Sequence, residues 1–302
     1  MSEPVYIVPV CDGKVVDADP ADVADAIAAS HPLWHAEIAQ LGTLRLENVN
    51  GVRMLAVDGK VECGPVFICG DVSSSLDVAH SLHSFELLPE WGSVLAVSQS
   101  SGRGQMRRDW SSPAGNIYAV LRLPVASGYP DSLSSLVVAY CFARAFGSLG
   151  LEVRIKWPND LLHSDRKFGG ILLEDRAGAL FAGIGINLAY RPDDTMLRKD
   201  AAVSACALEE CGFHGAPLQL WRKLVERAFF CYYNEVLRFS EDGLISRLEA
   251  YLAWVGRVVN VHGSDFGNCP GRLMGLSHDG ALRVLLSGRE QVLHSCSLSL
   301  TS

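Results

Sequence analysis

Short apolar runs bounded by turn-forming residues recur along the chain, and runs of this kind predict β-strands. In the first half of the chain they lie at residues 5–10, 41–48, 53–57, 66–69, 94–97 and 117–123. Asn50-Gly51 separates the second run from the third and predicts a hairpin. Asp19-Pro20 predicts the start of a short helix that ends near residue 29. We therefore expect residues 1–65 to form a small α/β extension that ends in turn-forming residues. The sequence indicates no chemical role for it.

Longer segments with apolar residues at helical spacing alternate with the later strands. They predict helices at residues 133–149, 218–239 and 244–254, and strands at residues 153–155, 171–174 and 182–188. From Gly256 onward the pattern returns to short strands, at residues 257–262, 271–276, 281–285 and 291–300, with a tight turn at Asp279-Gly280. The predicted fold class is α+β, with a mixed sheet and helices over residues 66–255 and a small SH3-like β domain over residues 256–302.

Composition and charge argue against several classes of protein. The chain has 302 residues, of which 49% are hydrophobic and 20% are charged, so disorder is not expected. A formal net charge of -8 argues against a general nucleic-acid binder. The nine cysteines are scattered, which predicts reduced thiols in a cytoplasmic protein with neither disulfides nor a structural metal. No segment resembles a signal peptide or offers about 18 uninterrupted apolar residues, so neither export nor a membrane location is expected.

The polar stretch between the predicted strands at 94–97 and 117–123 is the first candidate for chemistry. Gly102 and Gly104 allow a ligand to approach the backbone closely. Arg103, Arg107 and Arg108 supply guanidinium groups that match phosphate and carboxylate oxygens. This pattern indicates a site for a phosphate-bearing small molecule. A basic surface turn would have the same composition, so the loop alone leaves both interpretations open.

Three further places in the sequence carry the same ambiguity. Ser73 to Ser75 open a predicted helix, where one hydroxyl can cap the helix and another can bind a ligand. Lys156 follows a strand and precedes Trp157-Pro158, which indicates either a cation in a crevice or a solvated surface lysine. Asn187 lies near the end of an apolar strand, where its amide can satisfy a structural hydrogen bond or contact a nucleotide.

Four motifs in a fixed order are similar to those of the biotin protein ligase family, the biotin–[acetyl-CoA-carboxylase] ligases. They are Ser74-Ser75, Gly102-Arg103-Gly104 with the following Trp110-Ser111-Ser112-Pro113 and Gly115-Asn116-Ile117-Tyr118, Lys156-Trp157-Pro158-Asn159-Asp160, and Gly183-Ile184-Gly185-Ile186-Asn187. The resemblance covers residues 66–300 and leaves out the first 65, which lack the pattern of a winged helix-turn-helix. It implies a biotin/lipoate ligase-like catalytic domain at residues 66–255.

The resemblance implies an ATP-dependent ligase that works in two steps. Biotin would be activated as biotinyl-5′-AMP with release of pyrophosphate, and the biotinyl group would then pass to a lysine of a biotin carboxyl carrier protein or domain. ATP and Mg²⁺ are the implied cofactors, and biotin is the substrate. The implied protein partner is the carrier. Neither DNA nor a membrane is expected as a partner, and the chain is expected to be a monomer or a homodimer.

The resemblance also assigns roles to individual residues. Lys156 and Arg103 would be catalytic, and no residue is expected to ligate a metal. The implied biotin-binding residues are Ser74, Ser75, Gln99, Gly102, Arg103, Gly104, Gln105, Lys156, Gly169 and Gly170. The implied ATP-binding residues are Arg103, Arg108, Trp110, Lys156 and Asn187.

The chain departs from the family pattern at three positions. Gln105 stands where the family has an arginine that helps to retain the adenylate. Arg107 stands where glycine is usual, and Leu76 stands where the family often has asparagine. Because Gln105 cannot make the charge-assisted contact of an arginine, we expect the adenylate to escape more readily.

Two other functions remain open from the sequence. A lipoate- or octanoate-type protein ligase would share the fold and the essential lysine. A non-enzymatic biotin sensor or repressor would need a DNA-reading element, and the sequence shows neither a recognition helix nor a basic domain. The Lys156-Trp157-Pro158-Asn159-Asp160 motif, the Gly-Arg-Gly loop and the C-terminal β domain favour the biotin ligase.

Overall fold

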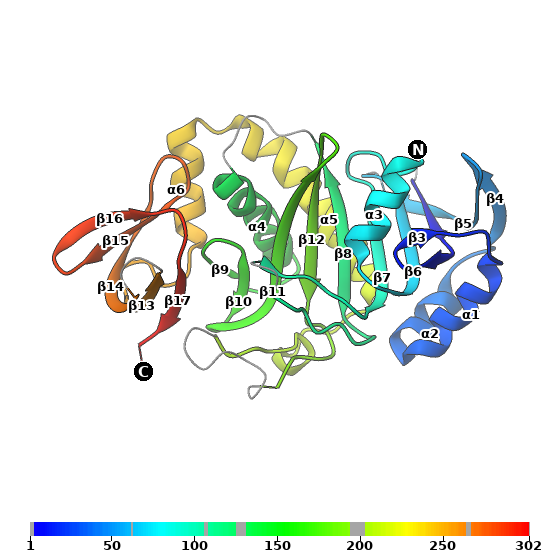
Figure 1. Ribbon diagram of the computed structural model, residues 1–302, viewed down its shortest axis with the longest axis horizontal. Coiled ribbons are helices and arrows are strands. Elements are labelled where there is room, and N and C mark those ends of the chain that lie inside the picture. Colours follow the sequence, from blue (N-terminus) through cyan, green and yellow to red (C-terminus); the bar gives the residue numbers. More distant parts are fainter. Residues whose placement is uncertain are drawn as a thin grey trace.

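A computed structural model describes residues 3–61, 63–105, 108–124, 131–193, 203–263 and 267–301. Its central feature is a ten-stranded sheet in the order β4-β5-β1-β6-β7-β8-β12-β11-β10-β9 (Figure 1). The strands are β1 (Glu3–Ile7), β4 (Arg45–Val49), β5 (Val52–Val61), β6 (Val66–Val72), β7 (Ser93–Gln99), β8 (Ile117–Leu123), β9 (Arg154–Lys156), β10 (Asp160–His163), β11 (Arg166–Arg176) and β12 (Ala179–Ile186).

The middle of the sheet is built from the most apolar runs of the sequence. β6 and β7 are buried along most of their length, as is typical of strands that are covered on both faces. β6 pairs in parallel with β1 and with β7, whereas β7 and β8 pair antiparallel. The combination of both kinds of pairing with packed helices confirms the predicted α+β class and the mixed sheet.

The residues before β6 extend this sheet at one edge. β1 and β5 pair antiparallel, and β5 and β4 form the hairpin that was predicted at Asn50-Gly51. Two helices, α1 (Pro20–Ser30) and α2 (Pro32–Gln40), and a two-residue ladder between β2 (Val10–Cys11) and β3 (Lys14–Val15) complete the segment. The sheet is therefore continuous across the turn-rich stretch where the sequence indicated the end of the extension.

α1 confirms the helix predicted near residue 20, but the sequence analysis missed α2. The nine residues of α2 are too few to display a clear apolar period. Glu37 of α2 is buried, and its two carboxylate oxygens accept the backbone N–H groups of Leu218 and Gln219, each at 2.7 Å. These two groups begin a helix far along the chain, so α2 caps that helix from outside.

Different helices cover the two faces of the sheet (Figure 1). α4 (Asp131–Ser148) and α5 (Pro217–Asn234) pack on one face, together with side chains such as Leu121. α3 (Ser75–Ser84) packs on the other face, together with side chains such as Val120. Leu121 and Val120 are neighbours in β8, and successive side chains of a strand point to opposite faces. The sheet thus lies between two apolar cores.

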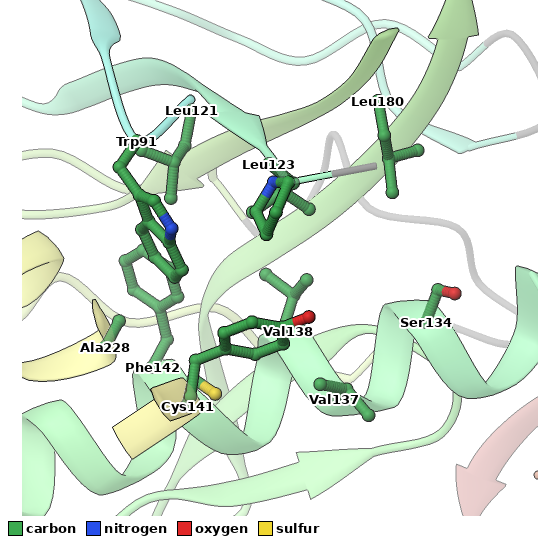
Figure 2. Close-up of a pocket in the computed structure, with 12 residues that line it drawn as sticks. Trp91, Leu121, Leu123, Ser134, Val137, Val138, Cys141, Phe142, Leu180 and Ala228 are labelled. Carbon is green, nitrogen blue, oxygen red and sulfur yellow. The ribbon is translucent and has the colours of Figure 1, made fainter. Parts of the chain in front are cut away.

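A small apolar cavity of about 40 Å³ lies on the face that α4 and α5 cover. Its lining is almost entirely apolar, and its volume suits only a few atoms, so it is a gap in the packing and not a site for a nucleotide. Side chains from the sheet and from both helices face one another across it in Figure 2, among them Trp91, Leu121, Leu123, Val137, Val138, Cys141, Phe142, Leu180 and Ala228.

A second, antiparallel sheet follows α6 (Glu241–Tyr251), in the order β16-β15-β14-β13-β17. Trp157 donates its indole N–H to the carbonyl oxygen of Gly280 at 3.0 Å, which ties this sheet to the loop beside Lys156. The sequence predicted one strand at residues 291–300, and the structure has two. The strands are β13 (Val258–Gly263), β14 (Gly267–Leu276), β15 (Leu282–Leu286), β16 (Arg289–Leu293) and β17 (Ser297–Leu300).

Two short 3-10 helices, η3 (Glu209–Cys211) and η4 (Val236–Arg238), complete the described secondary structure. η4 occupies the end of the segment that was predicted as one helix up to residue 239. Within the described ranges, no helix has both the length and the hydropathy that crossing a membrane requires.

Candidate active site

One large cleft of about 970 Å³ opens on the face of the sheet that carries α3. Side chains from the ends of β7, β9, β10, β11 and β12 and from the loop after β7 line it. The cleft gathers most of the residues to which the sequence assigned a role: Ser74, Ser75, Gln99, Gly102, Arg103, Gly104, Gln105, Arg108, Trp110, Lys156, Gly170 and Asn187. Arg107 lies outside the described residues.

Gly169 is the sequence-predicted site residue that does not line the cleft. Its neighbour Gly170 faces the cleft, and adjacent residues of a strand point to opposite sides. A Cβ atom at Gly169 would lie 3.1 Å from the carbonyl oxygen of Gly185 and 3.4 Å from a methyl carbon of Leu161, which belongs to the buried core. Close packing inside the sheet therefore accounts for this glycine.

Neutral hydrogen-bonding groups form one end of the cleft. Ser75 donates both its backbone N–H, at 2.8 Å, and its hydroxyl, at 2.9 Å, to the side-chain oxygen of Gln99. The amide nitrogen of Gln99 donates to the hydroxyl of Ser112 at 2.9 Å. Ser74 stands at the N-cap of α3 without a side-chain capping bond, although it is buried. The capping role that the sequence allowed for this serine is therefore not used here.

The Gly-Arg-Gly loop packs against itself. A Cβ atom at Gly102 would lie 2.4 Å from the carbonyl oxygen of Trp110 and 2.6 Å from the hydroxyl of Ser112. A side chain at this position would prevent the loop from closing on itself, so the packing of the loop alone requires glycine here. Arg103 donates to the carboxylate of Asp77, in the first turn of α3, and forms an ion pair with it. The sequence analysis did not single out Asp77, because nothing local links it to a loop some 26 residues away.

Three charged side chains form the centre of the cleft. Lys156 at the end of β9 and Asp160 at the start of β10 are register partners, and the Nζ atom of Lys156 lies 3.0 Å from Oδ2 of Asp160. The Nζ atom of Lys167 lies 2.6 Å from Oδ1 of the same carboxylate. The side chains of Lys156 and Asp160 are 11% and 13% exposed. Lys156 is therefore a nearly buried cation rather than a solvated surface lysine.

Asp160 is ionised in this arrangement. Burial raises the pKa of its carboxyl, but the charges of Lys167 and Lys156 and their hydrogen bonds outweigh burial and bring the pKa down to about 2. Two ammonium groups thus share one carboxylate, which leaves a net positive charge beside the nearly buried side chains of Lys156 and Asp160. A fixed charge of this kind interacts strongly with an anion, because the surrounding dielectric is low.

A flat platform forms the other side of the cleft. Gly170 in β11 and Gly185 in β12 are register partners, and the indole ring of Trp110 lies across both. A Cβ atom at Gly185 would lie 2.6 Å from Cε2 of the ring, and one at Gly170 would lie 3.3 Å from Cζ3. The Nζ atom of Lys167 lies 5.2 Å from the centre of the same ring. The sequence analysis named Trp110 but not Lys167, whose only local signal is a charge beside a turn.

The loop that follows β12 is fixed by two asparagines. The side chain of Asn187 is buried and donates to the carbonyl oxygen of Cys206 at 3.3 Å, which is the structural bond that the sequence left open. Asn187 lines the cleft as well. The side-chain oxygen of Asn116 accepts the backbone N–H groups of Leu188, Ala189 and Tyr190, at 2.9, 3.0 and 2.9 Å. The polypeptide beside the platform is therefore held in one conformation.

The C-terminal sheet contributes to the rim of the cleft. Cys296 and Ser297, where β17 begins, line it. Burial raises the pKa of the Cys296 thiol to about 11, although the charge of Lys156 acts in the opposite direction. This thiol is therefore protonated near neutral pH and is not an activated nucleophile.

The donor set of the cleft limits how a metal ion could be held. Over the described residues, no cluster of three or more His, Cys, Asp or Glu side chains could bind a metal ion. The carboxylates that line the cleft are Asp109 and Asp160, and Asp160 is already paired with two lysines. Mg²⁺ usually binds through substrate phosphates and few protein carboxylates, so these residues fit an ion that arrives with a nucleotide.

Known proteins are similar to the part of the chain that forms this cleft. Residues 70–190 match the biotin/lipoate A/B protein ligase family. The chain is 31% identical over 197 residues to the bifunctional ligase/repressor BirA of Bacillus subtilis, a match that covers 57% of this chain and 60% of that protein. It is 34% identical over 148 residues to the biotin–[acetyl-CoA-carboxylase] ligase of Paracoccus denitrificans, which covers 45% of this chain and 60% of that protein.

A solved structure agrees with the fold. The biotin protein ligase from Aquifex aeolicus in complex with biotin and ATP superposes with a TM-score of 0.64 at 23% sequence identity, covering 78% of this chain and 99% of that one. The sequence matches thus span about three fifths of the length of the curated relatives. The chain is therefore similar to the biotin/lipoate A/B protein ligase family over residues 70–190, and it shares its fold with a biotin protein ligase.

Proposed function

We propose that this protein is an ATP-dependent ligase that activates biotin as biotinyl-5′-AMP and transfers the biotinyl group to a lysine of a biotin carboxyl carrier domain. The observation that carries the proposal is the charged centre of the cleft, where the nearly buried pair of Lys156 and Asp160 is joined by Lys167. The same cleft is lined by neutral hydrogen-bonding groups and by a flat aromatic platform. The Paracoccus denitrificans relative, a biotin–[acetyl-CoA-carboxylase] ligase, supports biotin as the substrate.

The first step joins two anions. A carboxylate oxygen of biotin forms a bond to the α-phosphorus of ATP, the bond between that phosphorus and the bridging oxygen breaks, and the electron pair leaves with pyrophosphate. Negative charge accumulates around the phosphorus in the transition state, and fixed cations stabilise it. Lys156, Lys167 and Arg103 line the space in which this charge would develop. Asp160 keeps the two ammonium groups from repelling each other before the substrates arrive.

The second step transfers the biotinyl group from the adenylate to the carrier. The uncharged amine of the carrier lysine attacks the acyl carbon of the adenylate, the bond from that carbon to the phosphate oxygen breaks, and AMP leaves while the amine gives up a proton. AMP is a good leaving group once its phosphate charge is balanced. The same cations can supply that balance, so one charged centre serves both steps.

The two ends of the cleft suit the two substrates. Ser75, Gln99 and Ser112 offer neutral donors and acceptors that match the ureido group of biotin. The indole ring of Trp110, which lies across Gly170 and Gly185, offers a flat apolar surface for the adenine ring. Gly102, Gly104 and Gln105, in the loop after β7, line the same cleft. We assign biotin to the serine side and ATP to the side of Trp110, Arg108 and Asn187.

The remaining assignments rest on the chemistry of the donor set. Mg²⁺ would be carried by the phosphates of ATP, where it would neutralise part of their charge. The nine cysteines are free thiols in the structure, which fits a reducing compartment, and we propose that the reaction takes place in the cytoplasm. The protein partner is the carrier domain.

Exchange of labelled pyrophosphate into ATP tests this function directly. We expect exchange that requires biotin and that neither lipoate nor octanoate supports. Exchange with lipoate or octanoate but not with biotin would assign the chain to the lipoate- or octanoate-type ligases instead. Biotin binding without any exchange would indicate a sensor.

A further inference from the structure

The segment before β6 contacts, at two separate points, residues that are sequence neighbours of those lining the cleft. Between β2 and β3 the chain turns tightly at Asp12 and Gly13, both with positive φ values, of 48° and 73°. This turn packs on the first turn of α3, and the backbone N–H of Val15 donates to the hydroxyl of Ser81, farther along the helix, at 3.2 Å. The second point is His31, between α1 and α2. Neither Gly13 nor His31 is among the residues that line the cleft.

The turn at Gly13 presses against the serine side of the cleft. A Cβ atom at Gly13 would lie 2.6 Å from Cβ of Asp77 and 3.0 Å from the hydroxyl oxygen of Ser73. Ser73 directly precedes Ser74, and Asp77 is the residue that pairs with Arg103. The turn therefore supports both the serine-rich start of α3 and the anchor of the Gly-Arg-Gly loop.

His31 presses against the platform side. Its Nδ1 atom accepts the backbone N–H of Leu33 at 3.2 Å and caps α2. Because Nδ1 is the acceptor, this bond assigns the proton of the neutral ring to Nε2. Nε2 lies 3.4 Å from the hydroxyl oxygen of Tyr190, and a Cβ atom at Gly115 would lie 2.8 Å from Nε2.

Tyr190 belongs to the loop that borders the platform. Asn187 and Pro192, on either side of it, both line the cleft. The ring of His31 meets the ring of Tyr190 edge to face, with 5.8 Å between their centres. Asn116 holds the backbone of this loop from one side, and His31 holds the Tyr190 side chain from the other. Loss of either support would let the loop move away from a nucleotide on the platform.

We propose that residues 3–61 act as a positioning element of the ligand cleft, with Gly13 supporting the biotin side and His31 supporting the ATP side. The proposal rests on the function proposed above, because it needs biotin and ATP as the ligands. Gly13 and His31 act through other residues and are not catalytic. Each contact touches one side of the cleft, so each should affect one ligand and spare the other.

Calorimetric titration of the full chain with biotin and, separately, with ATP tests this proposal. Gly13→Ala should weaken biotin binding about threefold to tenfold, the scale of one lost neutral hydrogen bond, and leave the Kd for ATP within twofold. Gly51→Ala is the matched control, because Gly51 also has a positive φ, of 84°, in the same segment but has nothing within 4 Å of its would-be Cβ. Gly51→Ala should change neither Kd.

His31→Asn should produce the opposite pattern. Asparagine keeps a side-chain acceptor for the cap of α2 but is too short to reach Tyr190, so ATP binding should weaken about threefold to tenfold and biotin binding should not change. His31→Gln places an amide N–H where Nε2 lies and should restore much of the ATP affinity. Tyr190→Phe should lose as much ATP affinity as His31→Asn, and the double variant no more than either alone.

The outcomes separate this proposal from the proposed function. Absence of biotin and ATP binding in the unaltered protein would contradict the function itself. Normal binding by the unaltered protein, with His31→Asn within twofold of it for ATP or with Gly13→Ala indistinguishable from Gly51→Ala for biotin, would overturn the positioning role. If Gly13→Ala does not fold, the His31 and Tyr190 variants decide the proposal by themselves.

Discussion

The indole ring of Trp110 and the missing side chain of Gly185 fit together: a Cβ atom on this glycine would lie 2.6 Å from Cε2 of the ring. Gly185 lies within β12, where glycine weakens a strand unless something approaches the backbone closely. Here the approaching group is a side chain of the same protein, and it lies beside Lys167, whose Nζ atom is 5.2 Å from the ring centre. Trp110 thus links the platform to the charged centre of the cleft.

This relationship predicts that Gly185→Ala displaces Trp110 and weakens ATP binding about tenfold or more, with a smaller effect on biotin. Displacement of the ring is measurable as a change in tryptophan fluorescence, and ATP binding is measurable by calorimetry. Gly183→Ala is the matched control, because its added Cβ would meet the nearest atom, a methyl carbon of Leu76, at an ordinary 3.5 Å. Equal effects of the two variants on ATP binding would contradict the role of the platform.

The charged centre predicts a specific dependence of stability on pH. The pKa of Asp160 is lowered to about 2 in the folded protein, below the value of about 3.9 for a free aspartate. A lowered carboxyl pKa adds stability that is present above about pH 4 and is lost as the pH falls towards 2, an effect of about 2 kcal/mol. Urea unfolding across this range should show a steeper loss of stability for the unaltered protein than for Asp160→Asn, and parallel curves would argue against an ionised Asp160.

The loop predicts leakage of the reactive intermediate. Gln105 lines the cleft but cannot make a charge-assisted contact to a phosphate. We therefore expect biotinylation of bystander proteins when no carrier domain is present, and we expect Gln105→Arg to suppress it while carrier biotinylation continues. A streptavidin blot with a neutral bystander protein measures the leakage. Gln291→Arg, which adds the same charge on β16 outside the cleft lining, should leave the labelling unchanged. Negligible labelling by the unaltered protein would contradict this prediction.

Local patterns in the sequence predicted much of the fold. The α4 helix, the hairpin at Asn50-Gly51 and most strands of both sheets follow from apolar periodicity and turn residues. Several short elements were not predicted, among them α2, β3 and β10. α2 is brief and is delimited by the His31 cap and by Pro32, and the final predicted strand is broken near Cys296. The structure of such short elements depends on the residues they pack against. A local sequence pattern carries no information about those contacts.

Long-range pairing accounts for what the sequence could not supply. The pairing of β1 with β6 makes the N-terminal segment part of the main sheet. The sequence of neither strand indicates which strand it pairs with. The pairing of Asp160 with Lys167 follows from the hairpin of β10 and β11, and the pairing of Asp77 with Arg103 follows from how α3 packs. The ordered motifs indicated which residues meet in the cleft. They did not indicate which of these residues form ion pairs and hydrogen bonds with one another.

The rate of adenylate formation in Lys156→Ala tests the central claim most directly. If the nearly buried ammonium of Lys156 stabilises charge in the transition state, its removal should slow a single turnover of biotin and ATP by about 100-fold to 1,000-fold. The fold should persist in far-ultraviolet circular dichroism, and Lys223→Ala, at an exposed lysine of α5, should retain the full rate. A single-turnover rate for Lys156→Ala within a few-fold of that of the unaltered protein would contradict the account.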